Sequence, residues 1–113
     1  LTAARAYGLD IIDGVYNNFR DIDGLRRESL QARMLGFDGK SLIHPDQVAI
    51  ANEVFGPGDE EVASARKIIA AFAMPENRGK GVINMDGRMV ELLHAEMAKR
   101  VVVIADAIAA RKK

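Results

Sequence analysis

The chain has 113 residues, of which 49% are hydrophobic, a size and composition typical of a small globular domain rather than of a disordered segment. The charges of its sixteen basic and sixteen acidic residues cancel, so the chain has no basic excess that would favour binding to nucleic acid or anionic lipid. The chain has no cysteine, which excludes disulfides, zinc–thiolate sites and thiol nucleophiles. The longest apolar run, residues 101–105, is far shorter than the roughly 20 residues that cross a bilayer, so we expect a cytoplasmic protein with no membrane or nucleic-acid partner.

The first half of the chain alternates helix and strand. Gly8 and Gly36 are expected to end helices, because glycine readily adopts the left-handed conformation found there. Asp21 or Asp23 can cap the second helix, and Pro45 suits the first turn of the third. The expected elements are a helix end at 1–7, a strand at 9–15, a helix from about 21 to 35, a strand at 40–43 and a helix from 45 to about 55. Because the chain starts within a helix, we expect it to be part of a longer polypeptide.

The second half begins at the break Gly56-Pro57-Gly58, where we place a domain boundary between residues 1–55 and 56–113. Asp59 is expected to cap a helix from about residue 60 to 73. The pair Asp86-Gly87 predicts a tight turn between two short strands. The remaining expected elements are a loop at 75–81, strands at 82–85 and 88–90, and a last helix from about residue 91.

Three helices carry apolar residues at helical spacing, and these faces are expected to be buried. The stripes comprise Leu25, Ala32 and Leu35 in the helix at 21–35, Val62, Ala65, Ile68, Ile69 and Phe72 in the helix at 60–73, and Leu93, Met97, Val101, Ile104 and Ile108 in the last helix.

The order strand, helix, strand, helix in the first half is typical of parallel βα units. The strand at 9–15 is almost continuously apolar, which indicates a strand covered on both faces. Two parallel strands alone make a poor sheet, and a complete (βα)8 barrel needs about 250 residues. We therefore expect an α/β fold in which residues 1–55 supply two βα units of a barrel.

Several sequence blocks carry a family resemblance that spans nearly the whole chain. The blocks are Ile12-Asp13-Gly14-Val15-Tyr16-Asn17-Asn18-Phe19, Asp21 to Gly24, Leu35-Gly36-Phe37-Asp38-Gly39-Lys40, Ile43-His44-Pro45-Asp46-Gln47, Ala51-Asn52-Glu53-Val54-Phe55-Gly56-Pro57 and Asp86-Gly87-Arg88-Met89-Val90. In these blocks the chain resembles the citrate lyase β-subunit and malyl-CoA lyase family, within the aldolase and citrate lyase superfamily.

The resemblance implies the last two units of a (βα)8 TIM barrel, followed by a C-terminal extension that folds over the active site of a neighbouring subunit in a homo-oligomer. It implies a carbon–carbon lyase that splits a malyl-CoA, citramalyl-CoA or citryl-CoA type substrate into acetyl-CoA and a 2-oxo acid. It also implies Mg2+ as cofactor, with carboxylate ligands on earlier strands that this chain does not contain. We therefore expect no activity from the 113-residue chain alone.

Glu91 is the first candidate for catalysis. The resembled family has an aspartate after the Gly-Arg-Met-Val type of segment, which acts as a general acid–base group, and Glu91 keeps the carboxylate on a longer stem. Its ordinary structural explanation is a first-turn glutamate that favours the positive end of a helix dipole. Asp86 is a weaker candidate, because an aspartate before Gly87 is expected from turn geometry alone.

The candidates for substrate or CoA binding are Asp13, Gly14, Ser41, His44 and Pro57. Asp13 and Gly14 end the first predicted strand and His44 follows the second, near the barrel end that carries chemistry, whereas Ser41 lies within the second strand. Ser41 replaces a tryptophan common in malyl-CoA lyases, and Pro57 matches a position near bound CoA in the resembled proteins. His44 is equally well explained as a group that pins its loop, Asp13-Gly14 as a turn, and Pro57 as a helix stop.

Four further residues invite structural explanations. Lys40 stands at the start of the predicted second strand, at the barrel end that usually serves stability. His94 is expected to be a surface or packing residue. Tyr16 and Phe19 could line a ligand site or pack their loop.

Two alternatives to the lyase remain open. The chain could be a non-catalytic module that associates with copies of itself through exposed strand edges and its apolar last helix. It could instead belong to a lyase-like acyl-CoA thioester hydrolase.

Overall fold

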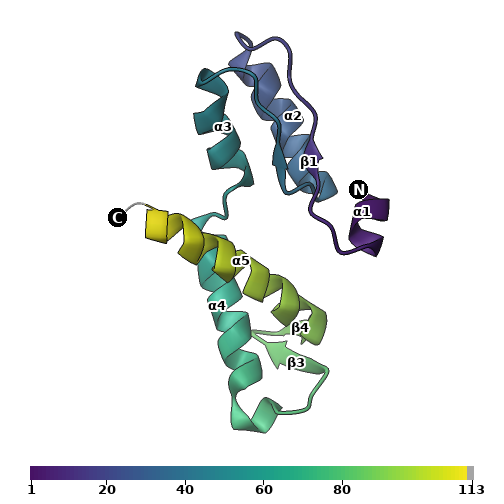
Figure 1. Cartoon of the computed structure of the whole chain (residues 1–113). Coiled ribbons are helices and arrows are strands. Elements are labelled where there is room, and N and C mark those ends of the chain that lie inside the picture. Colours follow the sequence, from purple (N-terminus) through teal and green to yellow (C-terminus); the bar gives the residue numbers. More distant parts are fainter. Residues whose placement is uncertain (112–113) are drawn as a thin grey trace. The chain divides into compact units, whose positions relative to one another are not determined.

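The computed structural model describes residues 1–111 and shows two compact units, one from Leu1 to Gly56 and one from Pro57 onward (Figure 1). The division falls within the Gly56-Pro57-Gly58 segment. No helix within residues 1–111 combines the length and the apolar character needed to cross a bilayer.

The first unit is built from two βα units. Its strands β1 and β2 pair in parallel, with Ile12 opposite Gly39 and Asp13 opposite Lys40. This pairing confirms the predicted parallel arrangement. The elements are α1 (Thr2–Ala6), β1 (Ile12–Asp13), α2 (Ile22–Leu35), β2 (Gly39–Lys40) and α3 (Asp46–Phe55).

Both strands are shorter than predicted, and Lys40 ends β2 rather than starting it. The prediction that the first strand is covered on both of its faces is wrong for this chain. Helix α2 packs against β2 and α3, whereas Ile12 on the other face of β1 remains 60% exposed. Among the described residues no third strand pairs with β1 or β2, so the parallel sheet has only two strands and few hydrogen bonds between them.

Helix α2 begins and ends where the sequence predicts. The Asp21 carboxylate accepts a hydrogen bond from the Gly24 N–H at 2.9 Å, and Gly36 closes the helix with a φ of 105°. Leu25 and Ala32 are buried as expected, but Leu35 is 61% exposed. At 100° per residue, Leu35 lies about 80° around the helix from Leu25, whereas Ala32 lies only about 20° away.

Ser29 is fully buried beside Leu25 in α2, and its hydroxyl has no hydrogen-bond partner among the described residues. An unpaired buried hydroxyl costs free energy that a methyl group does not. We expect Ser29→Ala to raise the free energy of unfolding by about 1 kcal/mol in urea denaturation. A loss of stability instead would show that the hydroxyl has a partner, such as a bound water.

The second unit packs α4 against α5, with a β-hairpin between them in sequence (Figure 1). Asp86 and Gly87 have φ values of 53° and 78°, which is the conformation of a tight two-residue hairpin turn. The predicted hairpin is therefore confirmed. The elements are α4 (Asp59–Ala73), a short 3-10 helix (Pro75–Asn77), β3 (Val82–Met85), β4 (Arg88–Glu91) and α5 (Leu92–Arg111).

Both predicted helix starts in this unit lie within one residue of the observed ones, but the roles expected of Asp59 and Glu91 there are wrong. Asp59 is the first helical residue of α4, not its cap, and the N–H of Gly58 donates to the Glu61 carboxylate at 3.4 Å. Glu91 is the last residue of β4, because its backbone pairs with Val82 in the hairpin, and α5 begins one residue later.

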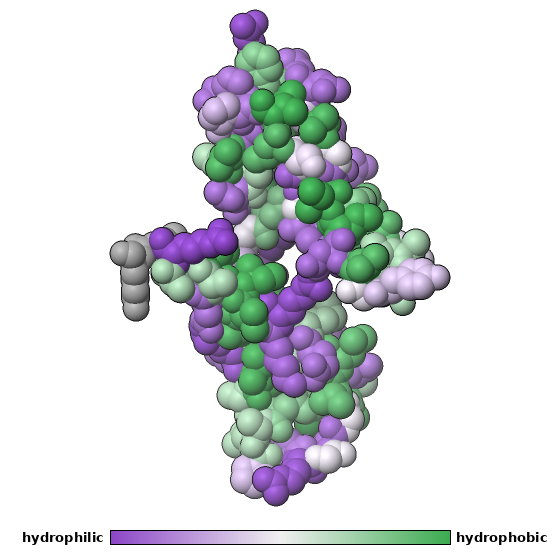
Figure 2. Space-filling view, viewed as in Figure 1, coloured by the Kyte–Doolittle hydropathy of each residue, from purple (hydrophilic) through white to green (hydrophobic). Residues whose placement is uncertain are grey.

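The buried face of α5 also differs from the predicted stripe. Ala95 and Ala98 are buried, whereas Leu93 and Met97 are 63% and 60% exposed. Ala65 is the buried residue of α4, so small side chains let the two helices approach closely. The larger apolar side chains flank this contact, and hydrophobic residues gather on the exposed surface (Figure 2).

Candidate functional site

Four of the candidate residues gather at the carboxyl edge of the β1–β2 pair in the first unit. Asp13 ends β1, Gly14 follows it, and the Ser41 N–H donates to the Asp13 carbonyl at 2.9 Å, just beyond β2. His44 lies in the loop that leads to α3. In a barrel of parallel strands this edge carries the residues that contact substrate.

Gln47 joins the two loops of this edge, and the sequence analysis assigned it no role. Its side chain is fully buried; its Nε2 donates to the Tyr16 carbonyl at 3.0 Å, and its Oε1 accepts from the Ile43 N–H at 2.9 Å. Gln47, Ala51 and Val54 share the buried face of α3. A polar residue on this otherwise apolar stripe is the signal that could have identified it.

A second link between the same loops is made by two rings. His44 stacks on Phe19, with the ring centroids 4.5 Å apart and the planes inclined by 14°. The His44 Nδ1 accepts the Asp46 N–H at 3.2 Å, and the Arg20 guanidinium lies 5.3 Å from the Phe19 ring centroid. These contacts pin the loop, so contact of His44 with a substrate stays a prediction.

Lys40 forms an ion cluster with Asp13 and Glu28. The lysine side chain is 0% exposed, and its Nζ lies 2.7 Å from the Asp13 carboxylate and 2.5 Å from that of Glu28. Burial lowers the pKa of Lys40, but the hydrogen bonds to Asp13 and Glu28 outweigh burial and raise the pKa above its ordinary value. Glu28 belongs to α2, so the cluster attaches the strand ends to the helix layer.

Asp21 holds the start of α2 and the β1–α2 loop together. The Tyr16 hydroxyl donates to one of its carboxylate oxygens at 2.8 Å, while the Gly24 N–H donates to the other. The hydrogen bond from the Gly24 backbone, and then that from Tyr16, lower the pKa of the Asp21 carboxyl. The carboxylate is therefore favoured in the folded state.

This shift predicts a pH dependence of stability. A carboxyl whose pKa is lowered by folding stabilises the protein above its ordinary pKa of 3.8, and this stabilisation is lost as the pH falls through the folded value. As the pH is lowered below 4, we expect the urea concentration at the midpoint of unfolding to decrease in the original chain and to decrease less in Asp21→Asn. Asp23→Asn, in the same first turn, is the control. Equal acid sensitivity of the Asp21 variant and the original chain would contradict the assignment.

Glu91 and Pro57 lie in the second unit. The Glu91 side chain is exposed and has no hydrogen-bond or ion-pair partner among the described residues. Its backbone N–H donates to the His94 Nδ1 at 2.9 Å, so His94 helps to close the start of α5. Pro57 lines a cavity of about 500 Å3, beside the Arg66–Asp106 ion pair. Asp86 occupies the hairpin turn.

The described residues do not fit a magnesium site. Among residues 1–111 no group of three or more histidine, aspartate or glutamate side chains is arranged to hold a metal ion. Asp13 and Glu28 approach each other, but the Lys40 ammonium lies between them. We therefore assign no step of a reaction to a metal bound by these residues.

Two parallel βα units, with polar residues at the carboxyl edge of their strands, are the kind of unit from which a TIM barrel is built. Residues 2–109 match the C–C bond lyase family of the TIM-barrel fold, and the chain belongs to this family. The resemblance to the citrate lyase β-subunit family and the partial TIM-barrel fold are thereby confirmed.

Individual relatives match this chain over most of its length. It is 54% identical over 110 residues to the (3S)-malyl-CoA thioesterase of Cereibacter sphaeroides strain ATCC 17025, covering 97% of the chain and 39% of that protein. It is 41% identical over 108 residues to the mitochondrial citramalyl-CoA lyase of Rattus norvegicus, covering 96% of the chain and 32% of the relative. It is 42% identical over 107 residues to the citrate lyase subunit beta of Leuconostoc mesenteroides subsp. cremoris, covering 95% of the chain and 35% of the relative.

A solved structure supports the same fold. The chain resembles the CitE protein of Mycobacterium tuberculosis, which was solved in complex with magnesium, acetoacetate and coenzyme A, with a TM-score of 0.67 and 32% identity over 90% of the chain and 38% of that protein. The chain thus spans between about a third and two fifths of the length of the relatives described here.

Proposed function

We propose that this chain is the C-terminal part of an enzyme that acts on CoA thioesters of short hydroxy acids, of the malyl-CoA, citramalyl-CoA or citryl-CoA type. The observation that carries the proposal is the family match over residues 2–109, joined to relatives named for malyl-CoA and citramalyl-CoA. The M. tuberculosis structure, which holds coenzyme A and a keto acid, supports the substrate class. Magnesium is proposed for the longer protein, with its ligands outside this chain.

The first proposed reaction is carbon–carbon cleavage. The hydroxyl group of the substrate loses its proton, the bond between its carbon and the thioester α-carbon breaks, and the electron pair passes to the α-carbon. Protonation of that carbon completes acetyl-CoA and leaves a 2-oxo acid. We propose that Glu91 supplies this proton, since its exposed carboxylate has no partner among the described residues.

The second proposed reaction is thioester hydrolysis. The chain is 54% identical to a malyl-CoA thioesterase but only 41% and 42% identical to two lyases, and this difference supports hydrolysis as a second candidate reaction. Water adds to the thioester carbonyl, the bond to sulfur breaks, and the products are the free hydroxy acid and CoA. The two reactions differ in their products, so one assay can separate them.

A segment exchange gives a direct test. The chain would replace its matching 110-residue segment in the C. sphaeroides protein, and the product would be assayed with malyl-CoA and magnesium. Acetyl-CoA with glyoxylate would support cleavage, and malate with free CoA would support hydrolysis. A folded exchange protein that forms neither pair would contradict the proposed function. Turnover by the 113-residue chain alone would contradict the expectation that it is inactive.

The exchange protein also tests Glu91. We expect Glu91→Gln to lower kcat about 100-fold, because the amide cannot deliver the proton. Glu91→Asp should retain activity, since it restores the carboxylate of the resembled family. Glu60→Gln, an exposed position in α4, is the control and should leave kcat unchanged. Equal kcat values for Glu91→Gln and Glu60→Gln would remove Glu91 from the mechanism.

The longer protein is also proposed to be a homo-oligomer whose active sites are shared between subunits. The support within this chain is the exposed apolar side of α5, including Leu93 and Met97. Sedimentation of the full-length protein would decide this, and a monomeric active enzyme would contradict it.

A further inference from the structure

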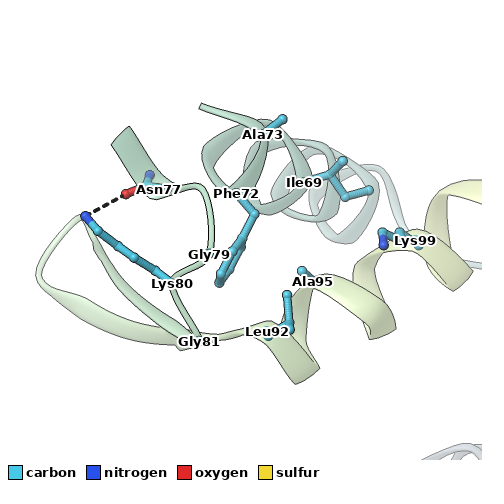
Figure 3. Close-up of a pocket in the computed structure, with 10 residues that line it drawn as sticks. All are labelled: Ile69, Phe72, Ala73, Asn77, Gly79, Lys80, Gly81, Leu92, Ala95 and Lys99. Carbon is cyan, nitrogen blue, oxygen red and sulfur yellow. Dashed lines mark hydrogen bonds between the residues drawn. The ribbon is translucent and has the colours of Figure 1, made fainter. Parts of the chain in front are cut away.

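The second unit contains a cavity of about 470 Å3 between the end of α4, the loop at 77–81 and the first turns of α5 (Figure 3). None of the six candidate site residues lines it. Its volume lies within the range of small-molecule sites in proteins, roughly 300–1,000 Å3.

Small residues leave this space open. Ala73, Gly79, Gly81 and Ala95 contribute to the wall, and a Cβ atom added at Gly79 or Gly81 would meet no atom within 4 Å. The Phe72 ring projects from α4 toward the loop and α5 in Figure 3. The middle of the cavity is therefore apolar.

The polar groups of the cavity are cationic or neutral. Its ten lining residues include Lys80 and Lys99 and no acidic residue. Figure 3 shows the two lysines on opposite sides, with Phe72 and Ala95 between them. In Figure 3 the Lys80 side chain runs away from Phe72 to Asn77, so its ammonium must turn from Asn77 toward the cavity to meet a ligand. An apolar middle between two lysines placed in this way is complementary to a molecule with an anionic group at each end of an apolar chain.

Both lysines are held in ways that a ligand could replace at small cost. The Asn77 side chain donates to the Ala71 carbonyl at 2.8 Å and accepts a long hydrogen bond of 3.3 Å from the Lys80 ammonium. Lys99 pairs with Glu96 at 2.7 Å in an exposed (i, i+3) ion pair. Such exposed pairs contribute roughly 0–1 kcal/mol, so a carboxylate on the ligand can compete with Glu96.

We propose that this cavity binds a straight-chain dicarboxylate, with its methylene chain over Phe72 and its two carboxylates at Lys80 and Lys99. The apolar wall favours the chain because each buried methylene group contributes about 0.8 kcal/mol. The lysines favour the two ends, since charge-assisted hydrogen bonds are stronger than neutral ones. A monocarboxylate or a diol of the same length would satisfy only part of the site.

The test uses the 113-residue chain, labelled with 15N and titrated with suberate, octanoate and 1,8-octanediol. Suberate is expected to give saturable amide shifts at Gly79, Gly81 and Leu92, and to bind about tenfold more tightly than octanoate, which lacks one carboxylate. Octanediol should bind more weakly still. Absence of saturable shifts, or octanoate binding as tightly as suberate, would overturn the proposal.

Matched variants locate the site. Ala73→Leu, at the end of α4, should fill the cavity and abolish binding, whereas Ala70→Leu on the same helix does not face the cavity and should bind normally. Lys80→Gln and Lys99→Gln, which change exposed side chains without filling space, should each weaken suberate binding about tenfold. Glu96→Gln should strengthen it by freeing Lys99. Unchanged affinity in either lysine variant would refute the two-ended arrangement.

Discussion

Lys40→Ala is expected to lower the free energy of unfolding of the chain by about 3 kcal/mol. The Lys40 side chain is 0% exposed and lies between the Asp13 and Glu28 carboxylates. Its removal leaves two like charges close together and partly desolvated, without the cation that attaches the strands to α2. Because both carboxylates are partly exposed, the loss should lie at the low end of values for broken buried ion pairs.

Lys99→Ala is the matched control, because Lys99 also pairs with a glutamate but lies on the surface. Its loss should cost about 0.5 kcal/mol. The raised pKa of Lys40 adds a second readout. Its contribution should be complete below the ordinary lysine value of 10.5 and be lost as the pH rises through the higher folded value. Equal effects of the two alanine variants in urea denaturation would show that the buried cluster is not important for stability.

Gln47→Leu is expected to lower the free energy of unfolding by a similar amount, about 3 kcal/mol. The leucine fits the apolar face of α3, but it leaves the Ile43 N–H and the Tyr16 carbonyl without their partner. Two unpaired backbone groups should outweigh the gain from a more apolar side chain. The loops at the carboxyl edge of β1 and β2 should also lose their fixed separation.

Gln31→Leu provides the control, since Gln31 is an exposed residue of α2. A surface substitution of this kind should change stability by no more than about 0.5 kcal/mol. In an amide NMR spectrum, Gln47→Leu should shift resonances from both loops, whereas Gln31→Leu should leave them in place. If Gln47→Leu were as stable as the original chain, the buried amide would not be the link that holds the two loops.

The features predicted correctly depend on residues close together in the chain. Asp21 and Gly36 bound α2 because a side chain three residues away caps its start and a left-handed glycine ends it. Asp86-Gly87 makes the hairpin because both residues adopt positive φ angles. The error at Glu91 is of another kind: this residue could lie in the first turn of a helix, but pairing with Val82 keeps it in a strand.

Part of the candidate site could also be predicted, because it depends on the order of neighbouring elements along the chain. The positions of Asp13, Gly14, Ser41 and His44 after two parallel strands place them at one edge, which the βα order alone indicates. The partners of these residues could not be predicted. Whether Glu91 and Pro57 belong to the same active site stays a prediction, since they lie in the other compact unit.

By itself the sequence determined the order of strands and helices, the cap and the end of α2, the hairpin turn, and the family to which the chain belongs. Tertiary structure alone decided that Lys40 would meet Asp13, 27 residues away, and that Gln47 would reach the Tyr16 carbonyl across 31 residues. It also decided that alanines, rather than the larger residues of α5, would form the buried contact with α4. Caps and turns arise from neighbours a few bonds apart, whereas these contacts arise from packing between elements that no local pattern encodes.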